Sequence, residues 1–215
     1  IFDDSTSQIR DAIRTREPRV RSRQVGEVVH EALRYWRFPD NTANIDDLLR
    51  SYAWQQRVTD PDDVQDVIRR AHRLLNLFQQ SDLYREIQNV RDARLPHYAE
   101  LPFVCRTDKR ILHGMIDFLY QRNDGTWVVL DYKTSVIAGM DSAPDARARQ
   151  HAKRFHLQLG AYASAVSREL NGLTPIVQIY YIQYNHTVVV PTDVWQTAIQ
   201  AIEHYIGNLL GGSST

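Results

Sequence analysis

Apolar residues recur at helical spacing through the first half of the chain and predict helices there. They form three stripes: Val25, Val28, Val29, Ala32, Leu33 and Trp36; Ile45, Leu48, Leu49 and Tyr52; and Val64, Val67, Ile68, Ala71, Leu74, Leu75 and Phe78. The second helix is expected to begin near Asn44. The third is expected at Asp60-Pro61, because an aspartate cap followed by proline is typical of a first helical turn. With a short helix after Ser81, residues 1–95 are expected to be helical.

The second half of the chain carries shorter apolar runs bounded by turn residues, which predict strands. Three strands are expected, at residues 98–106, 111–120 and 126–133, followed by a loop at 135–144 and one long helix at 147–170 that ends at Asn171-Gly172. A hairpin at 175–184 and 187–190 and a helix at 192–210 follow. The pattern therefore predicts an α/β part at residues 96–215, and a single domain at residues 1–215 in all.

Composition narrows the classes of protein that the chain fits. The 215 residues are 43% hydrophobic, which supports a proper core, and the formal net charge is zero, so any nucleic-acid surface must be local. The single cysteine, Cys105, excludes a disulfide framework and a four-cysteine cluster within this chain, and it favours a reducing, cytoplasmic compartment. The sequence contains no signal peptide and no apolar run long enough for a membrane span, so no membrane partner is expected.

Two acids and a lysine are predicted to meet at the ends of two neighbouring strands. Asp117 ends one apolar run, and Asp131-Tyr132-Lys133 ends the next. If Asn123-Asp124-Gly125 forms the hairpin loop between them, Asp117 lies directly opposite Asp131. Asp131 and Lys133, two residues apart on a strand, then share one face. An isolated Asp-x-Lys pair is also common on surface hairpins, so the opposed second acid carries the prediction.

That arrangement favours a divalent cation. Two carboxylates with apolar neighbours repel each other and lose hydration, which a cation relieves. Mg²⁺ takes one or two carboxylates together with water and phosphate, and a lysine beside it can assist an attacking water or stabilise developing charge. Lysine is rare in this chain, with only Lys109, Lys133 and Lys153. Lys133, at the end of an apolar strand, is therefore the candidate catalytic lysine.

The order of elements and five short motifs resemble the PD-(D/E)XK nuclease superfamily, and more narrowly its RecB/AddA-type nuclease domains at the end of bacterial helicase–nucleases. The motifs are Gly26-Glu27-Val28-Val29-His30, Glu100-Leu101-Pro102-Phe103, Gly114-Met115-Ile116-Asp117, Val129-Leu130-Asp131-Tyr132-Lys133-Thr134 and Gln158-Leu159-Gly160-Ala161-Tyr162. The resemblance implies a restriction-endonuclease-like α/β core, a mixed sheet in αβββαβ order, with an N-terminal helical elaboration.

The resemblance also implies an activity and a set of site residues. It implies Mg²⁺- or Mn²⁺-dependent hydrolysis of DNA phosphodiester bonds, exonucleolytic rather than site-specific, in DNA repair and recombination. His30, Asp117, Asp131 and the backbone carbonyl of Tyr132 would bind the metal, with Lys133 catalytic. Iron–sulfur cysteines and a Gly-Lys-Ser/Thr phosphate loop are absent from the sequence, so this chain would hold no cluster and no ATP site, and any helicase motor would lie outside it. DNA, as single strands or unwound ends, would be the substrate. The alternative is a non-cleaving DNA-binding or docking module.

Several candidate residues keep a structural alternative. His30 lies on a helix flank, where a solvated or hydrogen-bonded histidine is the ordinary case, and only the resemblance makes it a ligand. Glu100 could assist the metal site or simply be solvated at a strand entrance. Gln158 and Tyr162 lie one helical turn apart, and the resemblance implies that they touch DNA near the site, although Tyr162 also falls on an apolar face. Two basic stretches could bind phosphates or form solvated faces: one spans Arg10 to Arg23, and the other holds Arg147, Arg149 and Arg154.

Overall fold

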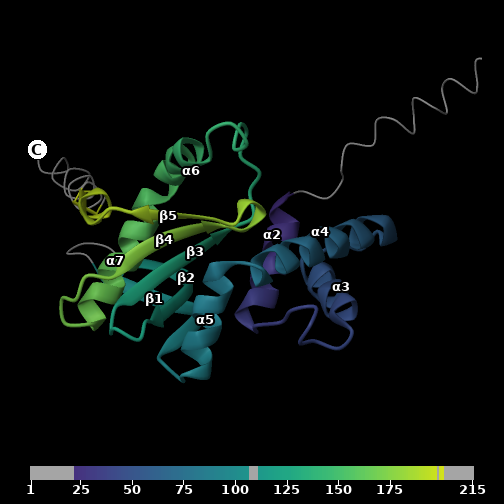
Figure 1. The fold of residues 1–215 in the computed structure, drawn as a ribbon, viewed down its shortest axis with the longest axis horizontal. Helices are drawn as coiled ribbons and strands as arrows, with labels where there is room; N and C mark the ends of the chain where they lie inside the picture. The colour runs from purple at the N-terminus through teal and green to yellow at the C-terminus, as the bar shows by residue number, and fades with distance from the viewer. Residues whose placement is uncertain (1–21, 107–110, 198, 201–215) are drawn as a thin grey trace, which may run out of the picture.

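A five-stranded sheet lies between two helical layers in the computed structural model (Figure 1), which describes residues 22–106, 111–197 and 199–200. The strands are β1 (His97–Arg106), β2 (Ile111–Gln121), β3 (Trp127–Lys133), β4 (Ile176–Tyr181) and β5 (His186–Val190), and they lie in that order across the sheet. Strands β3 and β4 run parallel, and the other neighbours are antiparallel. The mixed sheet and the αβββαβ order confirm the predicted fold class.

The first helical layer consists of α2 (Ser22–Arg34), α3 (Ile45–Gln55), α4 (Pro61–Gln79) and α5 (Asp82–Asp92). Asp60 caps α4 by accepting from the backbone N–H groups of residues 62 and 63, and Ser81 caps α5 in the same way. The predicted starts are thus confirmed. Asn44 precedes α3 in a left-handed conformation and makes no side-chain cap bond. No helix among the residues described has the length and apolar character needed to cross a membrane.

The predicted turn between β2 and β3 is confirmed, and with it the register. Gly125 adopts a left-handed φ of 86°, and the backbone N–H of Arg122 donates to the Thr126 carbonyl at 2.8 Å. Leu119 pairs with Val129, and Phe118 pairs with Leu130. One step further in this register sets Asp117 opposite Asp131, so both carboxylates come to the same end of the sheet.

The second helical layer differs from the prediction of one long helix at residues 147–170. It begins earlier, as α6 (Pro144–Ala152), passes through the 3₁₀ turn η1 (Lys153–Phe155), and continues as α7 (His156–Glu169). The interruption lies where Lys133 packs on Phe155. The spacing of apolar residues cannot predict such a tertiary contact. Helix α7 ends before Asn171-Gly172, as expected. Residues 192–197, 199 and 200 are helical, and the rest of the helix predicted at 192–210 lies outside the described residues.

The hairpin of β4 and β5 is present, but β4 is shorter than predicted. It ends at Tyr181, and residues Ile182–Tyr184 form the 3₁₀ turn η2. Asn185 then adopts a φ of 48° and accepts a hydrogen bond from the Tyr180 hydroxyl at 2.7 Å. The turn therefore connects β4 to β5. It lies at the end of the sheet where β3 finishes, because Tyr181 pairs with Lys133.

Two apolar cores lie on opposite faces of the sheet. Side chains of α2 to α5 pack on the face that presents Phe118, Leu130 and Tyr132. Side chains of α6, α7 and the segment around Trp195 pack on the other face. Because β3 and β4 are parallel, the chain needs the α6–α7 crossover to connect them. The candidate site lies beside α2, at the end of the sheet where β3 finishes.

Candidate active site

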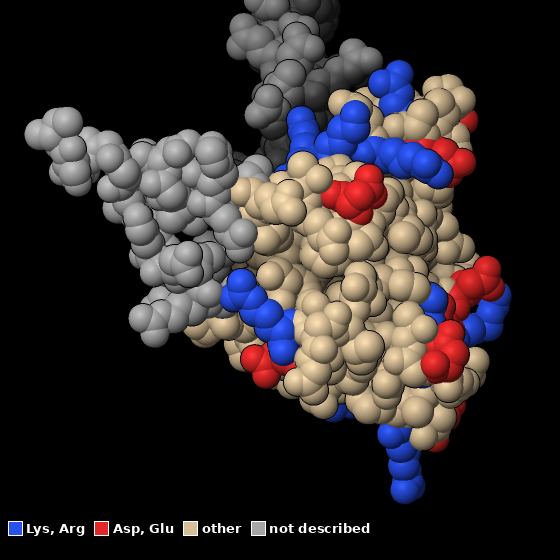
Figure 2. Space-filling view, turned by 90° about the vertical axis from the view of Figure 1, so that its left-hand side faces the viewer, with Lys and Arg blue, Asp and Glu red and all other residues tan. Residues whose placement is uncertain are grey.

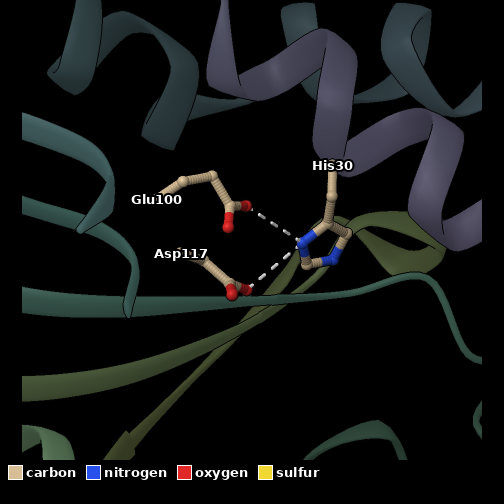
Figure 3. A group of neighbouring side chains, drawn as sticks. All are labelled: His30, Glu100 and Asp117. Carbon is tan, nitrogen blue, oxygen red and sulfur yellow. Dashed lines mark ion pairs between the residues drawn. The ribbon is translucent and has the colours of Figure 1, made fainter. Parts of the chain in front are cut away.

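Three side chains from three separate elements converge at the carboxyl end of β3 (Figure 3). His30 comes from α2, Glu100 from β1 and Asp117 from β2, and each offers one ligand atom within 4.8 Å of the other two. All three are partly buried. Of these residues, Asp117 was predicted by register, whereas His30 was assigned by resemblance and Glu100 was left open. The structure brings all three together.

The orientation of His30 is set by a backbone carbonyl. Its Nε2 lies 3.1 Å from the carbonyl oxygen of Tyr132, which can only accept, so in the neutral ring the proton sits on Nε2. Nδ1 then points toward Asp117 Oδ2 at 3.6 Å and Glu100 Oε1 at 3.9 Å. Metal-binding histidines commonly donate their other ring N–H to a carbonyl in this way. Nδ1 is thus left as the ligand atom, facing two carboxylates.

Glu100 reaches the cluster because its backbone is strained. It has a φ of 49°, a conformation that residues other than glycine rarely adopt. Its neighbours pair in register, Ala99 with Phe118 and Leu101 with Ile116, whereas Glu100 itself is missing from the ladder. Such strain costs of order 1–3 kcal/mol and clusters at functional sites. The kink turns the carboxylate toward His30, and nothing in the sequence around Glu100 predicts it.

Asp131 and Lys133 form a buried ion pair beside the three-residue cluster. The Asp131 side chain is fully buried, and its Oδ2 contacts the Lys133 ammonium. Its Oδ1 has no hydrogen-bond partner among the described residues. Lys133 lies over the ring of Phe155, with Nζ 4.4 Å from the ring centre. One buried carboxylate oxygen is therefore left without a donor at the edge of the site.

The carboxylates and His30 shift one another's proton affinities. Burial lowers the pKa of His30, but Asp117, Glu100 and Asp131 outweigh it and raise this pKa to about 9. Burial raises the pKa of Asp117 to about 7, against the opposing effect of His30 and of the Tyr132 N–H, which donates to Oδ2 at 2.8 Å. Burial also raises the pKa of Asp131, and Lys133 opposes it. The neighbouring carboxylates thus raise the pKa of His30, and burial is the largest cause of the raised pKa of Asp117 and of Asp131.

The donor set fits a hard divalent cation. Such ions take carboxylate and carbonyl oxygens, and an imidazole nitrogen suits Mn²⁺-like metals. Asp117, Glu100 and Nδ1 of His30 form a ready triangle, the Tyr132 carbonyl has a second lone pair, and Asp131 contributes an oxygen without a donor. Asp131 lies outside the tight triangle, because its other oxygen is held by Lys133.

A cavity of about 440 Å³ opens above these groups. His30, Glu100, Asp117 and Lys133 line it, together with Arg23 and Glu27 of α2, Gln56 after α3, and Thr134 and Ser135 after β3. Gly26 lets α2 approach β3 closely, because a Cβ at this position would lie 2.9 Å from Thr134 Oγ1. The site can thus admit a polar substrate group from solvent and hold it against the acids and the lysine.

The other predicted residues lie at varying distances from this cavity. Gln158 is exposed and donates to the hydroxyl of Tyr162, whereas Tyr162 is buried against Phe103. Burial raises the pKa of Tyr162 to about 12, and the nearby Asp131, Asp117 and Glu100 add to the shift. The two residues therefore stand near the acids, but Tyr162 is largely a core side chain.

Arg147, Arg149 and Arg154 are exposed on α6 and η1. Figure 2 shows the side of the molecule on the left of Figure 1, where Lys and Arg gather toward the upper edge and the middle carries few charges. Of the first basic stretch, only Arg23 is described, and it is exposed; Arg10 to Arg21 lie outside the described residues. On this face, the described Lys and Arg side chains thus gather at one edge and are not spread evenly.

Phe155 and Thr134 contact the site but were not predicted. Phe155 supports the Lys133 ammonium, and Thr134 stands where α2 meets the end of β3. An apolar residue in a helical stripe gives no signal that it underlies a lysine on a distant strand. Thr134 directly follows Lys133 in its motif, and that adjacency was the one available signal.

Comparison with family models identifies a nuclease family. The family model described as the PD-(D/E)XK nuclease superfamily matches residues 7–209. An ATP-dependent helicase/nuclease subunit from Lysinibacillus sphaericus is 31% identical over 94 residues, which cover 41% of this chain and 8% of that protein. A solved structure from Eubacterium rectale, provisionally described as an exonuclease, superposes with a TM-score of 0.53 at 9% identity, covering 89% of this chain and 69% of that one. At such low identity, this last likeness concerns the fold alone.

Proposed function

Because the chain belongs to the PD-(D/E)XK nuclease superfamily, we propose that it is a metal-dependent DNA nuclease domain that hydrolyses phosphodiester bonds. In this proposal, residues 1–215 form one domain, with His30 in the helical part at 1–95 and the α/β catalytic core at 96–215. We expect an exonuclease rather than a site-specific endonuclease, using Mg²⁺ or Mn²⁺.

One observation carries the proposal. Three potential ligands from α2, β1 and β2 converge in an open cavity, and the buried Asp131–Lys133 pair lies beside them. A merely structural cluster of this kind would be costly, because it gathers three carboxylates with too few donors. A purely docking module would gain nothing from that cost. The arrangement supports cleavage over the alternative of a non-cleaving DNA-binding or docking module.

The residues divide the chemistry among them. His30, Asp117, Asp131 and the Tyr132 carbonyl would hold the cation, with Glu100 close enough to assist. A cation there would polarise a phosphate oxygen as a Lewis acid and lower the pKa of a water. Lys133, fixed by Asp131 and Phe155, lines the cavity and donates to the attacking water or to the phosphate oxygen that gains charge. Because the Asp131 side chain is fully buried, bulk water does not compete for its side of this ion pair.

We also propose that the chain works with a helicase motor on single strands or unwound duplex ends, in cytoplasmic DNA repair and recombination. The support is the similarity to a helicase/nuclease subunit, of which the chain spans only 8%. A motor that delivers a strand would suit a chain whose formal net charge is zero.

The test is cleavage of end-labelled single- and double-stranded DNA with Mg²⁺, Mn²⁺ or Ca²⁺. Asp117→Ala, Asp131→Ala and Lys133→Ala should each abolish cleavage while the fold, followed by circular dichroism, is kept. Mn²⁺ should support cleavage at least as well as Mg²⁺, because an imidazole ligand suits it better. Ca²⁺ should allow binding with little turnover, since its longer bonds misplace the water.

Two outcomes would overturn the proposal. Near-normal activity in two of the three folded variants would show that these residues do not catalyse the cleavage. DNA binding without cleavage under any of the cations would favour the non-cleaving module. Arg69 is exposed and forms an ion pair with Asp66. Arg69→Gln is therefore a control variant, which should cleave as the wild type does.

A further inference from the structure

A second, smaller recess lies directly beside the candidate site. It has a volume of about 180 Å³ and is lined by Ser22 of α2, Arg70 and Arg73 of α4, Thr134 after β3, and Gln183 of η2, among others. Thr134 lines the large cavity as well. The two hollows are therefore neighbours across one residue, at the end of the sheet where the lysine and the acids lie.

The recess is electropositive, in contrast to the site. No carboxylate is among the described residues that line it. Arg70 is about one-third exposed, contacts Asp66 at 3.4 Å, and lies 3.5 Å from the Ser22 hydroxyl. Asp66 is shared, because it also holds Arg69. Arg73 is exposed, and within the described part of the chain no acid pairs with it. Asp66 thus balances part of the charge of Arg69 and Arg70, and no described acid balances that of Arg73.

Such a recess suits a phosphodiester group. Arginine presents a fork of N–H donors that matches phosphate oxygens, and the hydroxyls of Ser22 and Thr134 and the amide of Gln183 offer further donors. A strand that places one phosphate on the acids and Lys133 carries another phosphate next to it. The acids repel that neighbour, so a positive pocket one residue away would fix the direction in which the strand leaves.

We propose that Arg70 and Arg73 form a phosphate-binding subsite for the strand whose scissile phosphate occupies the neighbouring cavity. This subsite rests on the proposed function, which it extends by giving the path of the substrate. It differs from Arg147, Arg149 and Arg154, which lie in the helical layer on the other face of the sheet and line neither hollow. The two arginines position the strand and take no part in the bond cleavage.

The experiment compares two double variants of the 215-residue chain. Arg70→Gln/Arg73→Gln removes the subsite, and Arg50→Gln/Arg85→Gln removes two charges elsewhere, each paired with an acid of its own helix. A fluorescent single-stranded oligonucleotide is titrated in EDTA between about 50 and 200 mM salt. Each phosphate contact to a single strand contributes about 0.7 to the salt slope, so the subsite variant should be shallower by about 0.7 to 1.4, and the control unchanged.

Cleavage kinetics give the second measurement. The subsite variant should raise KM while kcat stays within about twofold, because a contact to the neighbouring phosphate acts on binding and does not touch the bond that breaks. Arg73→Gln alone, which breaks no ion pair among the described residues, should show part of the effect and so guards against misfolding of the double variant. An unaltered salt slope in the folded double variant would overturn the subsite.

The outcomes separate the subsite from the proposed function. If the wild type binds DNA with the steeper slope but never cleaves it, the subsite stands and the nuclease proposal falls. If the wild type cleaves and the double variant matches the control in slope and KM, the nuclease proposal stands and the subsite falls.

Discussion

His30 and Asp117 hold protons more tightly in the folded chain than in the unfolded one. The pKa of His30 rises from 6.5 to about 9, so its stabilising charge is present below about pH 6.5 and is lost as the pH rises to about 9. The pKa of Asp117 rises from 3.8 to about 7, so ionisation of this buried acid destabilises the fold as the pH rises toward about 7. Loss of the proton from either group therefore lowers the stability of the fold as the pH rises.

We predict that, in EDTA, the Tm of the chain falls as the pH rises from about 6 to 9. Asp117→Asn should flatten this dependence, because its amide neither ionises nor repels the other acids. Met115→Ala, which changes an exposed residue of β2 that carries no titratable group, is the control and should keep the wild-type slope. Excess Mn²⁺ should restore stability at high pH, since the cation replaces the lost proton. A Tm that climbs with pH in EDTA would contradict the sign of this linkage.

Phe155 gives a second prediction at the same scale. Its ring lies under the Lys133 ammonium, and such a contact is worth about 0.5 to 2 kcal/mol. Phe155→Leu should lower kcat by about twofold to thirtyfold with little change in KM, because the lysine loses its support but the strand does not. Phe155→Tyr keeps a ring and should recover most of the rate. Equal kcat in the Leu and Tyr variants would show that the ring serves packing alone.

Sequence reasoning succeeded for residues that the chain fixes locally. Asn123-Asp124-Gly125 determines the hairpin register, which the structure shows as far as the Phe118–Leu130 pair, next to Asp117 and Asp131. Sequence reasoning failed for residues whose placement depends on tertiary contacts. The left-handed backbone of Glu100 and the contact of Phe155 with Lys133 depend on elements far away in the chain. His30 lies 102 residues from the carbonyl that orients it, so only a family resemblance pointed to it.

At the scale of elements, the approach of α2 to β3 controls where His30 lies. Gly26 is one turn before His30, and a Cβ there would meet Thr134 Oγ1. Gly26→Ala should favour the helix by about 1 kcal/mol in propensity yet push α2 from the strand. We predict a loss of roughly tenfold in Mn²⁺ affinity, measured by calorimetry, as for other changes that misalign a ligand.

The matched partner of this variant is Thr134→Ala. On its own it should leave Mn²⁺ affinity near the wild-type value, and combined with Gly26→Ala it should restore most of what was lost, because the crowding atom is gone. Failure of the double variant to recover affinity would mean that Gly26 acts by some other route than the contact with Thr134.

The same scale shows what apolar spacing can and cannot predict about elements. The stripes on α2, α3 and α4 gave their positions because each helix buries one face against one core. The crossover was predicted as a single helix, since Lys153–Phe155 are all compatible with a helix, and the 3₁₀ turn there is visible only once β3 is in place. Strand β4 was extended too far because the apolar run continues through η2.

For the whole molecule, the question is how a chain of zero net charge holds DNA. Arg147, Arg149 and Arg154 are exposed together on α6 and η1. We predict that Arg147→Gln/Arg149→Gln/Arg154→Gln flattens the salt slope of DNA binding by about two to three units. It should raise KM and leave the rate at saturating DNA largely intact. The paired arginines Arg50, Arg69 and Arg85 provide a control triple of equal charge. If the two triple variants show the same salt slope of DNA binding, these three arginines are solvated and do not contact DNA.

The kinked backbone at Glu100 sets selection for activity against selection for stability. A glycine at this position would relax the left-handed backbone and remove one of the crowded carboxylates, so Glu100→Gly should make the metal-free fold more stable even as it weakens the site. A lineage that no longer needed to cut DNA would therefore drift away from this glutamate without cost. We therefore predict that relatives which cut DNA keep an acid at this position, and that relatives which have lost cleavage do not.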